Sequence, residues 1–265
     1  MKIDDKHRPI GVFDSGVGGI SLLSVLTDIL PNENFVFFGD HQNAPYGDKS
    51  SDEIFNLSKN VVDKLVQFNI KALVIACNTA TSAAKKRLEI EFPELPIVGI
   101  EPALKEAIDY GEDNILVLGT KATIKLEKFN NLLNRFKNYR KIYSTSCSGF
   151  ADYVESGQNN ENELERLFLT NLEQFLDNHI EAIVLGCTHY PFLMKDIERF
   201  FGKKIRFYTG YVGVAKQLQR RLYNLGLLTD KEVIGRITFL AEKKTTEDFY
   251  KQYYLNAKQL QLALR

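Results

Sequence analysis

The sequence has few cysteines, no excess charge of either sign and no long apolar run. Its 34 basic and 34 acidic side chains cancel over 265 residues, so no overall field attracts nucleic acid or an anionic membrane surface. The longest apolar runs are too short to cross a bilayer, and the polar residues 1–9 lack the apolar core of a signal peptide. We therefore expect a cytoplasmic protein with neither a nucleic-acid partner nor a membrane partner.

The number and spacing of the cysteines limit the kinds of site that they can form. Cys77, Cys147 and Cys187 make an odd number and include no C-x-x-C pair, which argues against a disulfide framework and a thioredoxin-like redox motif. The three cysteines and four histidines are too scattered along the chain to match a zinc pattern, so we expect no metal. Reduced thiols are expected. Cys147 has no matching partner motif and is expected to be structural.

Short apolar runs typical of strands alternate with helix-like stretches along the whole chain. This alternation predicts parallel sheets with helices on both faces, and the two halves of the chain resemble each other, so we expect two related, doubly wound α/β lobes. Ser51 or Asp52 is expected to cap the second helix. The predicted strands are 10–14, 35–39, 72–76, 97–100, 114–119, 141–144, 182–186, 204–208 and 236–241. The predicted helices are 20–30, 51–68, 80–91, 120–136, 164–176, 212–225 and 246–255, with another after Pro191.

Two cysteine-bearing runs, residues 72–81 and 182–191, share one pattern. An apolar stretch of about five residues ends at Cys77 or Cys187, and small hydroxyl or amide side chains follow it. Each thiol is therefore expected at the carboxyl end of a parallel strand and near the next helix, where open α/β sheets bind ligands. A helix N-terminus favours a thiolate, so we expect lowered pKa values for these thiols.

Two chemistries fit cysteines in such places. In the first, Cys187 and His189 act as the nucleophile and base of a hydrolase. In the second, two opposed thiols remove a proton from one face of an acidic carbon and return a proton to the other face. The turn of residues 14–19 lacks the G-x-G-x-x-G spacing, so no dinucleotide cofactor is inferred. Asp14, at the start of this turn, could orient an ammonium group or assist a base.

Four motifs occur together in an order that resembles bacterial glutamate racemases. They are Asp14-Ser15-Gly16-Val17-Gly18-Gly19, Pro45-Tyr46-Gly47, Ala76-Cys77-Asn78-Thr79-Ala80 and Leu185-Gly186-Cys187-Thr188-His189-Tyr190-Pro191. The resemblance implies an isomerase that interconverts L- and D-glutamate without a cofactor, supplies D-glutamate for peptidoglycan and forms a homodimer. It implies two pseudosymmetric lobes with mainly parallel sheets, and an active site in the cleft between them.

The resemblance also implies roles for individual residues. Cys77 and Cys187 would be the two acid/base residues, helped by Asp14 and His189 respectively. The residues implied at the glutamate substrate are Asp14, Ser15, Tyr46, Gly47, Asn78, Thr79, Thr188 and His189. Glu155 and Thr120 are implied as auxiliary residues.

The resemblance implies a domain division as well. The first lobe would hold residues 1–98 and 209–265 with Cys77, and the second would hold residues 99–208 with Cys187. Two stretches depart from the family pattern: Thr209-Gly210-Tyr211 stands where many members have Ser-Gly-Asp, and residues 146–150 lack the usual prolines. Neither touches the cysteines, so we expect activity to be kept.

Three other functions remain as alternatives. One is a racemase of the same fold that acts on aspartate or another amino acid. Another is a hydrolase or amidase that uses Cys187 and His189. The third is a non-catalytic amino-acid binding protein, which would have no need of two matched cysteines.

Overall fold

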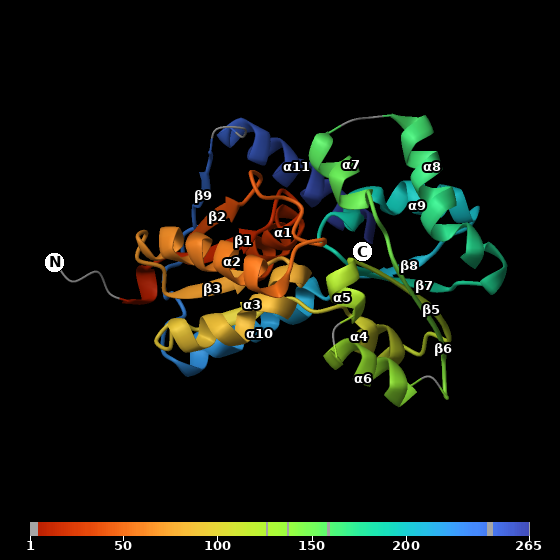
Figure 1. Ribbon diagram of the computed structural model, residues 1–265. Coiled ribbons are helices and arrows are strands. Elements are labelled where there is room, and N and C mark those ends of the chain that lie inside the picture. The colour runs from red at the N-terminus through yellow and green to blue at the C-terminus, as the bar shows by residue number, and fades with distance from the viewer. Residues whose placement is uncertain (1–4, 126, 137, 158–159, 243–245, 265) are drawn as a thin grey trace.

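Two parallel sheets form the cores of two α/β lobes that lie side by side (Figure 1). The structure, a computed structural model, describes residues 5–125, 127–136, 138–157, 160–242 and 246–264. All strand pairs in the described sheets are parallel. Helices cover both faces of each sheet, as the alternation of strands and helices predicts. The predicted fold class is therefore confirmed.

The first sheet has the strand order β4-β3-β1-β2-β9. Its strands are β1 (Ile10–Asp14), β2 (Phe35–Gly39), β3 (Ala72–Ile75), β4 (Ile97–Gly99) and β9 (Ile237–Leu240). Side chains alternate between the faces, so Ile10 and Val12 of β1 point into one core and Phe13 into the other. The first core is covered by α1 (Ile20–Ile29), α10 (Tyr211–Asn224) and α11 (Glu247–Leu264). The second is covered by α2 (Ser51–Val66) and α3 (Asn78–Glu91).

The second sheet has the strand order β6-β5-β7-β8. Its strands are β5 (Asn114–Gly119), β6 (Lys141–Ser146), β7 (Ala182–Gly186) and β8 (Arg206–Tyr208). One face packs on α4 (Leu104–Asp109), α5 (Lys121–Lys125) and α6 (Glu127–Phe136). The other packs on α7 (Phe150–Ser156), α8 (Glu161–Leu172) and α9 (Met194–Phe201). Short 3-10 helices are η1 (Asp5–His7), η2 (Glu173–Asn178) and η3 (Tyr190–Leu193).

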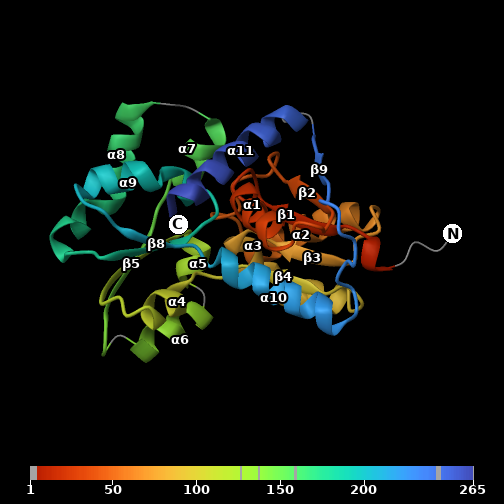
Figure 2. The same ribbon diagram turned by 180° about the vertical axis from the view of Figure 1, so that it is seen from behind.

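The chain passes between the lobes twice. It leaves the first sheet after β4, builds the second, and returns after β8, so that β9 completes the first sheet beside β2. Helix α11 then lies along α1, as the view from behind shows (Figure 2). It also contacts η3 of the second lobe. The domain limits at residues 98 and 208 stay a prediction, and β4 continues to Gly99.

Some helix boundaries differ from the predictions. Ser50, and not Ser51 or Asp52, caps α2, because its backbone is extended and its Oγ accepts a hydrogen bond from the N–H of Glu53 at 3.3 Å. Helices α4 and α7 were not predicted, since helices this short give no clear hydrophobic period. Pro191 lies in the first turn of η3, as predicted. In the described part of the chain, no helix is long and apolar enough to span a membrane.

Candidate active site

Cys77 lies two residues beyond the end of β3 and forms the N-cap of α3. Its Sγ accepts a hydrogen bond from the N–H of Ala80 at 3.3 Å and lies 3.5 Å from Oγ of Ser15. Burial is the main cause that raises the pKa of this thiol to about 12; the charge of Asp14 adds to the rise, and the two hydrogen bonds oppose it. The predicted lowering of this pKa is therefore wrong for Cys77, because lost hydration outweighs the field of the helix N-terminus.

Cys187 occupies the equivalent place after β7, and it is buried as well. Its Sγ lies 3.5 Å from Nδ1 of His189, the residue before η3. The structure thus brings the predicted thiol and histidine together. Thr188, the residue after Cys187, donates a hydrogen bond to Asp14, and Ser15, the next residue after Asp14, contacts Cys77, so the two cysteine motifs meet.

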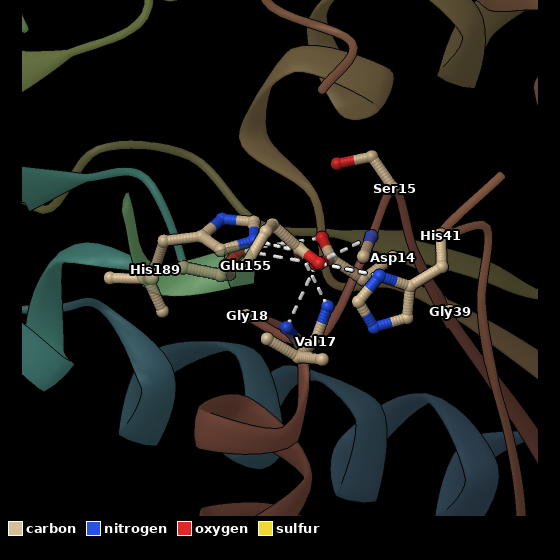
Figure 3. A network of polar contacts seen from close by, with 12 residues as sticks. Asp14, Ser15, Val17, Gly18, Gly39, His41, Glu155 and His189 are labelled. Atoms are coloured by element: carbon tan, nitrogen blue, oxygen red, sulfur yellow. Dashed lines mark hydrogen bonds and ion pairs between the residues drawn. The ribbon is translucent and has the colours of Figure 1, made fainter. Parts of the chain in front are cut away.

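Glu155 joins the two lobes at the centre of this site (Figure 3). Its Oε1 accepts a hydrogen bond from the N–H of Val17 at 2.8 Å and contacts Nε2 of His189. Its Oε2 lies 2.6 Å from Nδ1 of His41. Burial on its own would raise the pKa of Glu155, but the charge of His189 and its hydrogen bond, together with the nearby His41, hold the pKa at about 2. Glu155, named from the sequence as auxiliary, is therefore an ionised bridge between the lobes.

The same contacts keep a proton on His189. Burial on its own would lower the pKa of His189, but the charges of Cys187 and Glu155 and hydrogen bonds with them raise it well above its usual value. The imidazolium directs Nδ1 towards the sulfur of Cys187 and Nε2 towards Glu155. It is therefore placed to give a proton to Cys187 and to take one back.

Asp14 lies beneath the glycine-rich turn. Its carboxylate accepts hydrogen bonds from the N–H groups of Gly16 at 3.3 Å and Gly19 at 2.9 Å, and from the hydroxyl of Thr188 at 3.3 Å. Burial raises the pKa of Asp14, and the charge of His189 opposes that rise. The hydrogen bond from Thr188 shows that Asp14, like Glu155, connects the two lobes.

A second group of predicted residues meets beside the first. Thr79 at the start of α3 and Thr120 before α5 share a hydrogen bond of 2.9 Å between their hydroxyls. A Cβ on Gly47 would lie 3.2 Å from Cβ of Thr120, so the backbone of Gly47 packs closely against Thr120. The buried Tyr46 donates a hydrogen bond of 2.6 Å from its hydroxyl to Asp40. These contacts hold the loop that follows β2 close to Thr120 of the second lobe.

Asn78 differs from its neighbours because its amide is unpaired. Both Oδ1 and Nδ2 are buried, and neither has a hydrogen-bond partner among the described residues. Leaving such a group unpaired costs about 1–3 kcal/mol per group. An amide kept in this state at the N-terminus of α3 is a ready binding group for a polar ligand.

The two departures from the family pattern are accommodated in the structure. Tyr211 begins α10, and its hydroxyl lies 2.6 Å from Oγ of Ser21. That Oγ shares its one hydrogen between the carbonyl oxygens of Gly18 at 2.6 Å and Thr188 at 3.0 Å. Since serine has a single hydroxyl hydrogen, Tyr211 is the donor to Ser21. Tyr211 thus supports the backbone of both lobes beside the site.

The other departure, residues 146–150, contains Cys147. This thiol is buried, and burial raises the pKa of Cys147. The hydroxyl of Tyr190 donates a hydrogen bond to the carbonyl oxygen of Cys147 at 3.2 Å. Its packing in the core agrees with the structural role expected for it.

Two residues of the site were not predicted, Asp40 and His41. Both directly follow β2, whose carboxyl end lies beside that of β1 in the sheet. The rule that placed Asp14 and Cys77 at strand ends applies equally to β2. That signal was present in the sequence.

A sequence profile described as Asp/Glu/Hydantoin racemase matches residues 22–211. The chain belongs to this racemase family. A glutamate racemase from Clostridium kluyveri is 45% identical to it over 237 residues, covering 89% of this chain and 92% of the relative. Membership of the family makes the protein a racemase and therefore an isomerase.

Solved structures of racemases share its fold. A glutamate racemase isoform from Bacillus anthracis superposes with a TM-score of 0.79 and 31% identity, covering 93% of this chain and 92% of that one. The glutamate racemase from Francisella tularensis, solved in complex with D-glutamate, gives a TM-score of 0.77 and 27% identity, covering 96% and 94%. In the described ranges of this racemase, no three His, Cys, Asp or Glu side chains are grouped as a metal site would require.

Proposed function

We propose that this racemase interconverts L- and D-glutamate without a cofactor, with Cys77 and Cys187 as its two acid/base residues. The observation that carries the proposal is the matched placement of two buried thiols after equivalent strands, β3 and β7, of the two lobes. Inversion of a carbon centre needs a base on one face and an acid on the other. One cysteine strand alone would supply half of that chemistry.

Each turnover moves two protons. The thiolate of one cysteine takes the α-proton, so that an S–H bond forms as the Cα–H bond breaks and the electron pair stays on Cα beside the carboxylate. The thiol of the other cysteine then gives its proton to the opposite face and is left as a thiolate. No electrons are gained or lost, and catalysis in the reverse direction uses the same groups in exchanged roles.

The neighbours of the thiols supply the assistance that this chemistry needs. His189 exchanges a proton with Cys187, to which it lies close. On the other side, Ser15 is the direct contact of Cys77, and Asp14 acts through its charge. The ammonium group of the substrate, oriented by Asp14, adds a positive charge beside Cys77 and offsets the burial that keeps this thiol protonated.

The polar groups around the thiols suit the two carboxylates of glutamate. The unpaired amide of Asn78 is the strongest candidate, because a substrate oxygen would give it the partner that it lacks. The hydroxyls of Ser15, Thr79 and Thr188 and the loop at Tyr46-Gly47 complete the proposed pocket. Both thiols are buried, so the lobes must separate before the substrate can enter.

The choice of glutamate over aspartate rests on the relatives. Relatives that are 39% and 45% identical to this chain are glutamate racemases, and a structural neighbour was solved in complex with D-glutamate. In the cell, the proposed product would supply the D-glutamate of peptidoglycan. We place the enzyme in the cytoplasm, as a homodimer, as part of the same proposal.

Chiral analysis of the product tests the function. Incubation with L-glutamate should yield D-glutamate until the two are equal, and in D₂O the α-hydrogen of either enantiomer should exchange. Replacement of either cysteine by alanine should abolish racemisation, whereas Cys147→Ala should keep it. Absence of exchange with both enantiomers would refute the proposal, and faster turnover of aspartate would correct the substrate. A trappable acyl-enzyme at Cys187 would point instead to a hydrolase.

A further inference from the structure

His41 lies outside the predicted site but is connected to it through Glu155 (Figure 3). It follows β2 in the first lobe, and its side chain is 14% exposed. Its ring packs edge-on against Phe249 at 5.3 Å and beside Tyr250 at 6.2 Å, both on α11. This packing fixes the ring so that Nδ1 points at the carboxylate of Glu155.

The short contact defines the hydrogen on His41. Nδ1 lies 2.6 Å from Oε2 of Glu155, and two lone pairs would repel each other at that distance, so Nδ1 carries a hydrogen. Oε2 of Glu155 has no hydrogen-bond partner of good geometry among the described residues, so its attraction to His41 is mainly that of charge and dipole. Nε2 is buried without a hydrogen-bond partner among the described residues. The ring therefore interacts with polar groups chiefly through Glu155.

We propose that His41 is a positioning residue that, when the lobes are closed, draws the negative charge of Glu155 away from His189 and so eases proton transfer between His189 and Cys187. This inference rests on the proposed function, because it assigns His41 to the Cys187 half of the reaction. His41 is the end of a line of polar contacts that runs from Cys187 through His189 and Glu155 to the first lobe.

The physical reason lies in how the carboxylate is shared. Glu155 and His189 both belong to the second lobe, whereas Val17 and His41, which also approach the carboxylate, belong to the first. When the lobes separate, Glu155 keeps only His189, and its full charge holds the imidazolium proton firmly. When they close, Val17 and His41 take part of that charge, and the proton on His189 becomes easier to transfer. Closure of the lobes over the substrate thereby makes His189 a stronger acid towards Cys187.

The other titratable groups near Glu155 and His189 cannot draw negative charge away from Glu155 as His41 does. They are Asp14 from β1, Tyr253 from α11 and Cys187 after β7. Burial raises the pKa of Asp14 and of Tyr253, the latter also through the charge of Glu155, and neither group can carry a positive charge. Of these described groups, His41 and His189 can carry a positive charge.

Three substitutions separate the effect of the donor from that of packing. His41→Phe keeps an aromatic ring against Phe249 and Tyr250 but removes both nitrogens. His41→Asn places an amide N–H near the position of Nδ1 and restores a neutral donor. His41→Gln places its amide near the position of Nε2 instead, and it takes the place of His41→Phe if that variant does not fold. His179→Asn is the control, because His179 is exposed with a φ of +51° that asparagine tolerates.

The first measurement does not depend on turnover. NMR titration of ¹³C-labelled histidine follows the imidazole of His189, and with only four histidines in the chain the signals are assigned by substitution. Loss of the His41 donor leaves more negative charge beside His189, so its pKa should rise by about half a unit or more in His41→Phe. His41→Asn should recover at least half of that shift, and His179→Asn should show none.

The second measurement is the pH profile of kcat/KM for glutamate. Its alkaline limb, where His189 loses its proton, should move to higher pH by the same amount. One direction suffices, because the enantiomers have equal free energy and kcat/KM is the same both ways. An unchanged titration of His189 in His41→Phe, or equal shifts in the Phe and Asn variants, would overturn the inference. An inactive wild-type protein would refute the proposed function and leave the NMR test of His41 intact.

Discussion

Gly16 and Glu155 approach so closely that a side chain on residue 16 would displace the carboxylate of Glu155 from its present position. A Cβ on Gly16 would lie 1.7 Å from Oε1 of Glu155, and a Cβ on Gly18 would lie 2.6 Å from Oγ1 of Thr188. Neither glycine has a positive φ, so the requirement is for space and not for backbone conformation. The glycine-rich turn is therefore a contact surface between the lobes.

Gly16→Ala should displace Glu155 and reduce racemisation by about tenfold to a hundredfold, since small misplacements of groups in an active site have effects of this size. The carboxylate is the end of a flexible side chain and can move, so the fold should survive. Gly213→Ala is the matched control: its Cβ meets nothing within 4 Å, and alanine should stabilise α10 by about 0.5–1 kcal/mol. Steady-state kinetics and urea unfolding check both variants. Full activity in Gly16→Ala would mean that this contact does not matter for catalysis.

The strand–helix alternation predicts both sheets because buried parallel strands are continuous apolar runs, and the cysteines lie where those runs end. The contacts that assemble the site cannot be found in this way. Val17 and Glu155 are 138 residues apart in the chain, and no local pattern records that they pair. The pKa of Cys77 was predicted with the wrong sign, because helix capping is visible in the sequence and the extent of burial is not.

Asn78→Ala should weaken substrate binding while leaving the folded protein equally or more stable. The amide has no described partner, so its removal relieves a desolvation cost in the free protein and removes a binding group for glutamate. We expect KM to rise by about tenfold or more, with a smaller change in kcat. Steady-state kinetics with both enantiomers measure the change in KM and kcat, and a thermal melt without ligand measures the change in stability. Loss of stability with an unchanged KM would assign Asn78 a purely structural role.

Tyr211→Phe tests the support that Tyr211 gives to Ser21. Removal of the hydroxyl takes the donor from Ser21, and we expect a loss of about 1 kcal/mol in the free energy of unfolding. Racemisation should also fall, because Ser21 holds the backbone of Gly18 and Thr188. Tyr223→Phe, in the same helix and 73% exposed, is the control and should change neither quantity. If the two variants had the same stability and the same racemase activity, the hydroxyl of Tyr211 would not support Ser21.

Lys71 and Glu33 form a buried ion pair at the end of the first sheet away from the cysteines. Their side chains are 0% and 2% exposed, and Glu33 also accepts a hydrogen bond from the N–H of Thr229 at 2.9 Å. Lys71→Met leaves a buried carboxylate without its cation and should lower the free energy of unfolding by about 3–5 kcal/mol. Lys105→Met, at an exposed pair on α4, should cost less than about 0.5 kcal/mol. Urea unfolding distinguishes them, and equal losses would show that burial of the pair adds nothing.

Glu155 should also shape the stability of the protein in acid. Its pKa is about 2 in the folded protein, below the reference value of 4.5, so its contribution is present above about pH 4.5 and is lost as the pH falls towards 2. The difference of roughly 2.5 units corresponds to roughly 3 kcal/mol. His189 acts in the opposite sense: its raised pKa stabilises the fold below about pH 6.5 and is lost as the pH rises through the folded value.

Glu155→Gln should therefore be less stable than the wild type by roughly 3 kcal/mol near pH 6, where the ion pair is complete. The gap should narrow steadily below about pH 4.5, because acid removes the same charge from the wild type. Glu94→Gln, at an exposed site, should follow the wild type within about 0.5 kcal/mol. Urea unfolding at a series of pH values gives the comparison. A gap that stayed constant down to pH 3 would mean that Glu155 stabilises the junction of the lobes by shape and not by charge.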